Sequence, residues 1–97
     1  MEFEWDEDKA MLNSEKHGVE FEDAITVFDD PNAIVIYDRE HSDDEDRYII
    51  LGASKNARLL VVVHTYREPV IRLISARAAE KRERLEYEKE LAWMDAR

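Results

Sequence analysis

Four apolar runs separated by polar connections place the strongest constraint on how this chain can fold. The runs span residues 33–37, 47–53, 58–67 and 70–76, and they are rich in β-branched side chains. Runs of this kind, bounded by turn residues, are typical of β-strands. The acidic segment 38–46 is expected to be a loop. Strands joined by short connections lie antiparallel, so the last three runs predict a meander.

Helical signals lie on both sides of these strands. Asp6 suits the N-cap of a helix that continues to about His17, with Gly18 in the left-handed position after it. A second helix is expected over 21–28, where apolar residues recur at helical spacing. A third is expected over 78–96, which is rich in helix formers. The sequence therefore predicts one α+β domain, with N-terminal helices and a C-terminal helix packed on a small antiparallel β-sheet.

Both ends of the chain carry aromatic residues whose role the pattern leaves open. Phe3 and Trp5 alternate with acidic residues, which is compatible with either a short first strand or a packed N-terminal arm. Trp93 and Met94 lie on the last predicted helix and could remain available for a partner.

The turn between the last two strands decides which side chains share a face of the sheet. If Glu68–Pro69 forms a two-residue turn, Arg67 pairs with Val70, and Arg72 lies on the same face as Arg67. Strict alternation then places Arg77 on the opposite, more apolar face, which should receive the helices. The face with Arg67 and Arg72 is expected to stay partly open.

Charge is distributed unequally between the two halves of the chain. Residues 1–46 hold 17 acidic and 3 basic residues, a net charge of 3 − 17 = −14, whereas residues 47–97 hold 11 basic and 7 acidic residues, a net charge of +4. A chain with a total of −10 should repel nucleic acid as a whole. Its positive second half indicates either a local site for an anion or arginines that pair with the surplus carboxylates, and both remain open.

Composition excludes several classes of protein. The chain contains no cysteine, so it has neither disulfides nor thiolate chemistry. No apolar run reaches the length of a membrane span, and the N-terminus has no secretory pattern, so we expect a cytoplasmic protein without a membrane partner. Only two glycines are present, which excludes a glycine-rich phosphate loop, and no cofactor motif is found.

A set of residues spread over most of the chain resembles the BrnT toxins. The similarity runs from Phe3 to about Tyr87, and its two most specific blocks are Lys-His-Gly-Val and Ile-Ser-Ala-Arg. The matching positions are Trp5-Asp6, Lys9, Asn13, Lys16-His17-Gly18-Val19, Phe21-Glu22, Ala24, Val27-Phe28, Asp30-Pro31, Glu45-Asp46-Arg47, Gly52, Arg58-Leu59-Leu60, Arg67, Arg72-Leu73-Ile74-Ser75-Ala76-Arg77, Ala79, Glu83-Arg84 and Tyr87. Two positions depart from the pattern: Glu20 replaces a helix-capping Ser or Thr, and Glu68–Pro69 replaces a glycine-containing turn.

The resemblance implies a RelE-like fold and a ribonuclease toxin of a bacterial type II toxin–antitoxin operon. It implies cleavage of RNA without a metal ion and without a cofactor. The implied partner is a BrnA-like antitoxin whose ribbon-helix-helix domain binds operator DNA, so the toxin would contact that DNA only through the antitoxin. A homodimer, or a heterotetramer with the antitoxin, would be compatible with this role.

Arginines near the last hairpin are the first candidates for the site. Cleavage of RNA without a metal needs groups that hold the phosphate and stabilise its extra charge in the transition state, and the fixed fork of an arginine suits both tasks. Arg67 and Arg77 are predicted to be catalytic, and Arg72 to contact a phosphate. The alternative is that these side chains form only structural ion pairs.

Further candidates lie at the acidic loop and on the first helix. Glu45 could take the proton of a ribose 2′-hydroxyl with Arg47 beside it, although both could equally belong to a solvated loop. Lys9 and His17 could bind the substrate, but His17 could instead cap the end of its helix. His64 falls on the predicted core face and is expected to be structural.

The loop of residues 41–46 lacks the glycine and the spacing of a calcium loop, so no metal site is predicted. A second function from a different class remains open. The strongly acidic first half would also suit a non-catalytic interaction module that binds a basic partner.

Overall fold

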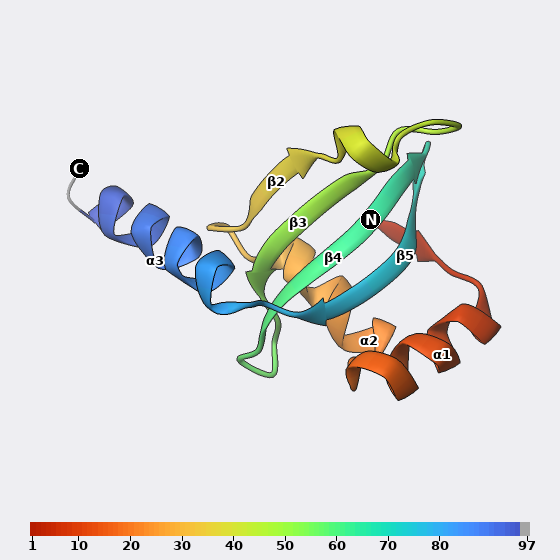
Figure 1. The fold of residues 1–97 in the computed structure, drawn as a ribbon, viewed down its shortest axis with the longest axis horizontal. Helices are drawn as coiled ribbons and strands as arrows, with labels where there is room; N and C mark the ends of the chain where they lie inside the picture. The colour runs from red at the N-terminus through yellow and green to blue at the C-terminus, as the bar shows by residue number, and fades with distance from the viewer. Residues whose placement is uncertain (96–97) are drawn as a thin grey trace.

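The computed structural model describes residues 1–95, with side chains described as far as Ala92. It contains a five-stranded sheet in the order β1-β5-β4-β3-β2, with helices against both faces (Figure 1). In chain order the elements are β1 (Glu2–Glu4), α1 (Glu7–His17), α2 (Phe21–Ala24), the 3₁₀ helix η1 (Ile25–Asp29), β2 (Ile34–Tyr37), the 3₁₀ helix η2 (Arg39–His41), β3 (Tyr48–Ala53), β4 (Leu59–Arg67), β5 (Val70–Ala78) and α3 (Lys81–Asp95).

The predicted α+β class and the antiparallel meander are confirmed, since β2, β3, β4 and β5 pair successively in antiparallel fashion. Of the two alternatives for the N-terminal segment, a strand or a packed arm, the structure contains the strand. This strand, β1, lies parallel to β5, with Phe3 opposite Ile71. The predicted helix end at Ala96 and the side chains of Trp93 and Met94 lie outside the described residues. No helix within residues 1–95 is long and apolar enough to cross a membrane.

The first helix begins and ends where its capping residues predict. The Asp6 carboxylate accepts hydrogen bonds from the backbone N–H groups of Asp8 (2.9 Å) and Lys9 (3.1 Å), which satisfies donors that a helix start otherwise leaves unpaired. Gly18 follows the last turn with φ +66°, a conformation that costs glycine little, and its N–H donates to the Ser14 carbonyl.

The predicted second helix is α-helical only over α2 and then tightens into η1. Its three fully buried side chains, Phe21, Ala24 and Val27, recur every third residue. That spacing matches the three-residue turn of a 3₁₀ helix and explains why the α-helix does not continue. The Thr26 hydroxyl donates to the Asp23 carbonyl (2.6 Å) at the junction.

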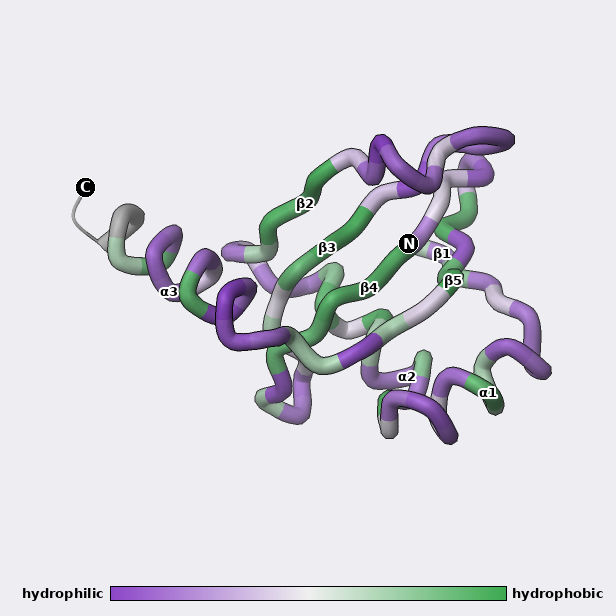
Figure 2. Tube along the Cα trace, in the orientation of Figure 1, coloured by the Kyte–Doolittle hydropathy of each residue, from purple (hydrophilic) through white to green (hydrophobic). Residues whose placement is uncertain are grey.

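One face of the sheet packs on α1, α2 and η1 and forms the main core. Hydrophobic residues are concentrated along the strands, and the loops are mostly hydrophilic (Figure 2). His64 lies in this face with no exposed surface, as predicted, and burial lowers its pKa. The buried members of the cluster are Val19, Phe21, Ala24, Val27, Ile50, Leu60, Val62, Ile71, Leu73 and Ala76.

The predicted two-residue turn and its register are correct at the hairpin tip, but the register changes farther along. Arg67 opposes Val70 and Thr65 opposes Arg72, and the peptide bond between Glu68 and Pro69 is cis. Between Val63 and His64 the pairing then shifts by one residue, which leaves Ile74 of β5 without an opposite partner. Such a bulge exchanges the two faces for every residue beyond it.

The placement of Arg77 on the apolar face is therefore wrong. Because the bulge precedes it, Arg77 opposes Val61 and lies on the same face as Arg67 and Arg72. Ala76 takes the core position instead and is fully buried. Alternation alone gave the wrong face because it assumes an uninterrupted ladder.

The side chain of Asn13 fixes β5 just beyond the bulge. Its Nδ2 donates to the carbonyls of Val19 (3.0 Å) and Ala76 (2.9 Å), and its Oδ1 accepts from the Ala76 N–H (3.0 Å). The carboxamide thus bonds the edge of β5 in the way that a neighbouring strand would. This contact links α1 to the strand that carries Arg72 and Arg77.

The opposite face of the sheet is covered in part by α3. Tyr87 is buried against Leu51, Leu59 and Val61. Its hydroxyl donates to the carboxylate of Asp30 at 2.6 Å. The hydrogen bonds that Asp30 accepts from Ala53, Tyr87 and Asn32 outweigh desolvation and lower its pKa.

We expect Tyr87→Phe to lower the free energy of unfolding by about 1–2 kcal/mol near neutral pH, because it removes a hydrogen bond to a carboxylate. Burial, followed by the hydrogen bond to Asp30, raises the pKa of Tyr87 to about 12. The folded protein therefore keeps this proton at pH values where the unfolded chain has lost it, and stability falls as pH rises from about 10 to 12.

The phenylalanine variant should lose less stability over that range than the wild type. Urea unfolding of both proteins at pH 8 and pH 11 measures the difference. An equal loss in both proteins would contradict the assignment to Tyr87.

Candidate functional site

The three candidate arginines form a row along one face of β4 and β5. Arg67 lies at the hairpin tip, Arg72 is next to it on β5, and Arg77 lies beyond the bulge. A strand advances about 3.3 Å per residue, so the Cα atoms of Arg67 and Arg77 are on the order of 20 Å apart. The three side chains share a face, but they do not converge on a single phosphate.

Each of these arginines is paired with a glutamate. Arg72 Nη1 lies 2.7 Å from a carboxylate oxygen of Glu4 on β1. Arg77 donates from both Nη atoms to Glu83, at 2.8 and 2.7 Å. Arg67 makes one longer contact, at 3.5 Å, with Glu45. The ion pairs that the sequence left as an alternative are thus present, and they differ in geometry.

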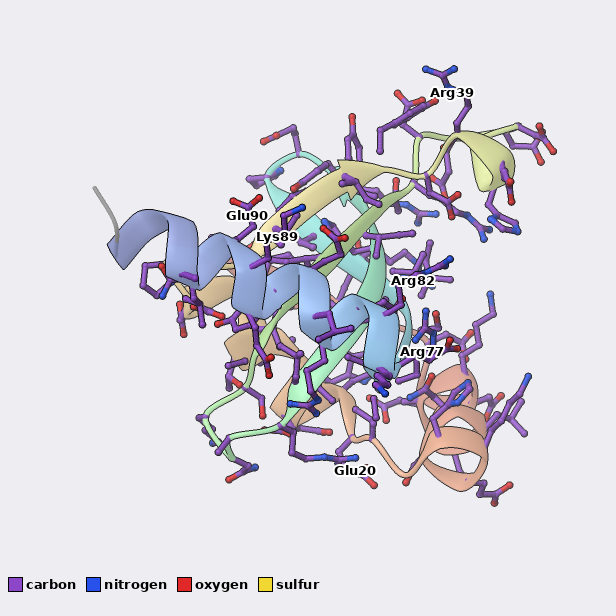
Figure 3. All side chains as sticks on the ribbon, turned by 60° about the vertical axis from the view of Figure 1, so that its left-hand side comes forward. Glu20, Arg39, Arg77, Arg82, Lys89 and Glu90 are labelled. Atoms are coloured by element: carbon purple, nitrogen blue, oxygen red, sulfur yellow. The ribbon has the colours of Figure 1, made fainter. Side chains whose placement is uncertain are left out.

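The pair at Arg77 is the most firmly held of the three. Arg77 lies beside the first turn of α3, as the labelled side chain in Figure 3 shows, and Glu83 comes from that turn. Glu83 also accepts from the backbone N–H of Glu80 at 2.8 Å. The two-bond contact raises the pKa of Arg77 and lowers that of Glu83. Arg77 therefore anchors the start of α3 to the sheet.

The pair at Arg67 is the most accessible. The side chains of Arg67 and Glu45 are 49% and 40% exposed, and a single 3.5 Å contact between exposed groups contributes little to stability. A phosphate could replace the carboxylate at Arg67 with little loss of binding energy. The structure thus brings Glu45 and Arg67 together from positions far apart in the sequence.

The loop that carries Glu45 is tied to the sheet at several points. The hydroxyl of Ser42 accepts from the Arg47 N–H (2.9 Å), and the hydroxyl of Thr65 donates to the Asp46 carbonyl (2.6 Å). Glu45 and Arg47 line one open depression of about 410 Å³. The other residues around it are Glu40, His41, Asp43 and Asp44. Among the described residues, no three carboxylates or imidazoles form a set that could hold a metal ion.

Lys9 and His17 lie at a different place, where α1 runs beside the bulge of β5. Both line a shallow pocket of about 210 Å³, together with Lys16 and Ser75. This basic pocket adjoins the part of β5 between Arg72 and Arg77 and is separate from the depression at Glu45. The sequence-based candidates therefore fall into two groups, one at the Arg67 end of the arginine row and one beside its middle.

Several residues that shape this surface were not identified from the sequence as parts of it. Glu4 and Glu83 set the availability of Arg72 and Arg77, and Lys16 joins Lys9 and His17 in their pocket. Lys16 stands directly before His17 in the Lys-His-Gly-Val block, which is a signal that could have included it. Glu4 lies 68 positions from Arg72, and only the pairing of β1 with β5 reveals the contact.

Comparison with known proteins gives a consistent result. Residues 5–83 match the family model described as "Ribonuclease toxin, BrnT, of type II toxin-antitoxin system". The crystal structure of the Brucella abortus ribonuclease toxin BrnT is similar, with a TM-score of 0.64 and 24% sequence identity, over 84% of this chain and 99% of that chain. At this identity the structural likeness supports the fold alone. A search of curated proteins found no match.

Proposed function

Because this chain belongs to the BrnT family of ribonuclease toxins of type II toxin–antitoxin systems, we propose that it cleaves RNA without a metal ion and is neutralised by a BrnA-like antitoxin. The observation that best supports cleavage by this chain is the exposed pairing of Glu45 with Arg67. A carboxylate and a guanidinium lie 3.5 Å apart there, at the end of a row of further arginines, and this supports a joint role on one substrate.

In the proposed reaction, Glu45 takes the proton of a ribose 2′-hydroxyl. The 2′-oxygen then attacks the adjacent phosphorus, a P–O bond forms, and the bond from phosphorus to the 5′-oxygen of the next nucleotide breaks. The leaving 5′-oxygen takes up a proton from solvent, and Glu45 releases the proton that it took. The products are a 2′,3′-cyclic phosphate and a 5′-hydroxyl end. Arg67 stabilises the charge that develops on the phosphate. Arg47, which lines the same depression as Glu45, assists it.

The remaining candidates hold the RNA on one side of the cleaved bond. Arg72 lies next to Arg67 and contacts a neighbouring phosphate, while Lys9 and His17 bind the strand farther along. Arg77 was predicted to be catalytic, but its distance from Arg67 suits a contact with a more distant phosphate. A local row of cations allows binding on a chain that otherwise repels polyanions.

Purified protein free of any antitoxin should cleave single-stranded RNA in the presence of EDTA and leave cyclic phosphate ends. Glu45→Gln should slow this cleavage by about 10²–10⁴-fold, the range typical of a lost general base. Gel analysis of end-labelled RNA measures the rate, and mass spectrometry identifies the ends. Intact RNA with the wild-type protein would refute the proposal. Activity that EDTA abolishes and Mg²⁺ restores would refute its metal-independent part.

The proposed antitoxin carries a ribbon-helix-helix domain and binds operator DNA, so that the toxin reaches this DNA only within the complex. Co-expression with such a partner should restore the growth of cells that this chain inhibits. A partner that restores growth without binding the chain in vitro would count against direct neutralisation.

A second candidate function is a non-catalytic module that binds a basic partner. It is favoured by one observation, that each of the three row arginines already has a glutamate partner. Under this alternative, growth and RNA would be unaffected by the chain and by Glu45→Gln.

A further inference from the structure

The outer edge of β2 is an exposed apolar strand edge. The sheet order places β2 last, and no strand within residues 1–95 pairs with its outer side. Val35, Ile36 and Tyr37 are 50%, 55% and 46% exposed. Proteins usually protect such an edge with a charge, a proline or a covering segment, because an unpaired apolar edge can add a strand from another chain.

The hydrogen-bond pattern shows which backbone groups are available. The N–H of Asp38 donates to the Arg47 carbonyl at 2.8 Å, so the bonded positions of β2 against β3 include Asp38. Bonded and non-bonded positions alternate along an antiparallel ladder. Tyr37 is one residue and Val35 three residues before Asp38, so both are non-bonded positions. Their backbone N–H and C=O groups therefore point away from β3, towards the open edge.

An apolar groove with an acidic border lies beside this edge. Ile34 and Ile36 point into it from β2, and α3 forms its other side (Figure 3), where Glu90 is labelled next to the strand. The groove has a volume of about 260 Å³. Its lining consists of five aliphatic and three acidic side chains, Ile34, Ile36, Ile49, Leu51, Val61, Glu83, Glu86 and Glu90.

We propose that β2 and this groove bind an extended segment of a partner protein in which apolar and basic residues alternate, and that the segment adds to the sheet as a sixth strand. Its backbone bonds to Val35 and Tyr37, and its basic side chains reach Glu86 and Glu90. A second copy of this chain fits poorly, because each copy carries a net charge of −10 and the same acidic groove.

The proposal deepens the proposed function, on which it rests for the identity of the partner, because the segment would belong to the antitoxin. The groove reaches the Arg77 end of the arginine row, since its lining includes Glu83, but it includes neither Arg67 nor Glu45. An antitoxin bound here leaves the contacts of Arg67 and Glu45 unchanged unless another part of it reaches them.

The test uses the full chain and a fluorescent synthetic peptide that alternates valine and lysine. Two control peptides separate strand addition from charge attraction: one has the same residues with the lysines in a block, and one alternates valine and glutamate. Fluorescence anisotropy should show binding of the first peptide only. Isotope-edited infrared spectra of that peptide should show a β-strand signal on binding.

Val35→Pro removes an outward N–H and no bond to β3, so the variant should fold and lose at least about ten-fold in affinity. Ile36→Lys should weaken binding similarly, because the new charge repels the lysines of the peptide. Ile36 is 55% exposed, so this variant replaces Val35→Pro in the test if the proline variant does not fold. Glu86→Gln with Glu90→Gln should weaken binding and lower its salt dependence.

Equal affinity of the wild type and the folded edge variants for the alternating peptide would overturn the proposal, as would equal affinity for the two lysine peptides. Self-association of the wild type that Val35→Pro abolishes would identify a second copy as the occupant instead. Displacement of the peptide by RNA would assign the groove to the RNA surface and also overturn it. Peptide binding requires no RNA cleavage, so an inactive chain that binds the peptide would refute only the ribonuclease proposal.

Discussion

Replacing Arg67 by alanine should slow RNA cleavage by about a hundred-fold or more while leaving the free energy of unfolding nearly unchanged. Removal of one preorganised donor to a developing negative charge typically costs about 10²–10³-fold in rate. The folded protein loses little, because the side chain is 49% exposed and its ion-pair contact with Glu45 is 3.5 Å long. Single-turnover cleavage and urea unfolding of the same preparations measure the two effects.

Two other arginines supply matched comparisons. Arg58→Ala removes a surface arginine that donates to the Gly18 carbonyl at 3.0 Å and is not part of the arginine row, and it should keep the wild-type rate. Arg77→Ala should lower stability as well as activity, because its bidentate pair with Glu83 holds the start of α3. If Arg67→Ala cleaves RNA as fast as Arg58→Ala, Arg67 has no part in the reaction.

Replacing Asn13 by leucine should lower the free energy of unfolding by about 3–5 kcal/mol. The substitution leaves three buried backbone groups without partners, namely the N–H and C=O of Ala76 and the C=O of Val19. Each unsatisfied buried group costs about 1–3 kcal/mol, and the added apolar surface offsets part of the total. Domains unfold with about 5–15 kcal/mol, so the variant should lie near the limit of folding.

Leu12→Ala is the control for this variant, because Leu12 precedes Asn13 on α1 and is 63% exposed. Its effect should stay within about 0.5–1 kcal/mol. Urea titration followed by circular dichroism measures both variants. A loss below about 1 kcal/mol for Asn13→Leu would show that water or a shifted β5 satisfies the groups that Asn13 bonds.

Local signals were sufficient to predict α1, the four antiparallel strands and the hairpin tip. Asp6 and Gly18 mark the ends of α1 because capping depends on neighbouring backbone groups alone. The two-residue connection at Glu68–Pro69 gave the correct pairing of Arg67 with Val70, since turn length sets the register of a hairpin. The family resemblance added the toxin class, which no local pattern could supply.

Features that depend on distant parts of the chain were missed. The bulge at Ile74 interrupts a run whose alternation looks continuous in the sequence, and Asn13, from another element, bonds β5 two residues beyond it. The pairing of Arg72 with Glu4 requires β1 to lie beside β5, and a short segment at the N-terminus carries no signal for its partner strand. The availability of each arginine could therefore be judged only from the structure.

The single unpaired residue at Ile74 has a practical meaning for comparing this chain with its relatives. In a homologue that lacks this extra position, the arginine equivalent to Arg77 would point towards the hydrophobic core, even where the neighbouring residues are identical. Sequence alignments should therefore permit a gap at this point before equivalent cations are assigned. Engineered deletions here would exchange solvent-facing and interior residues for the rest of the strand.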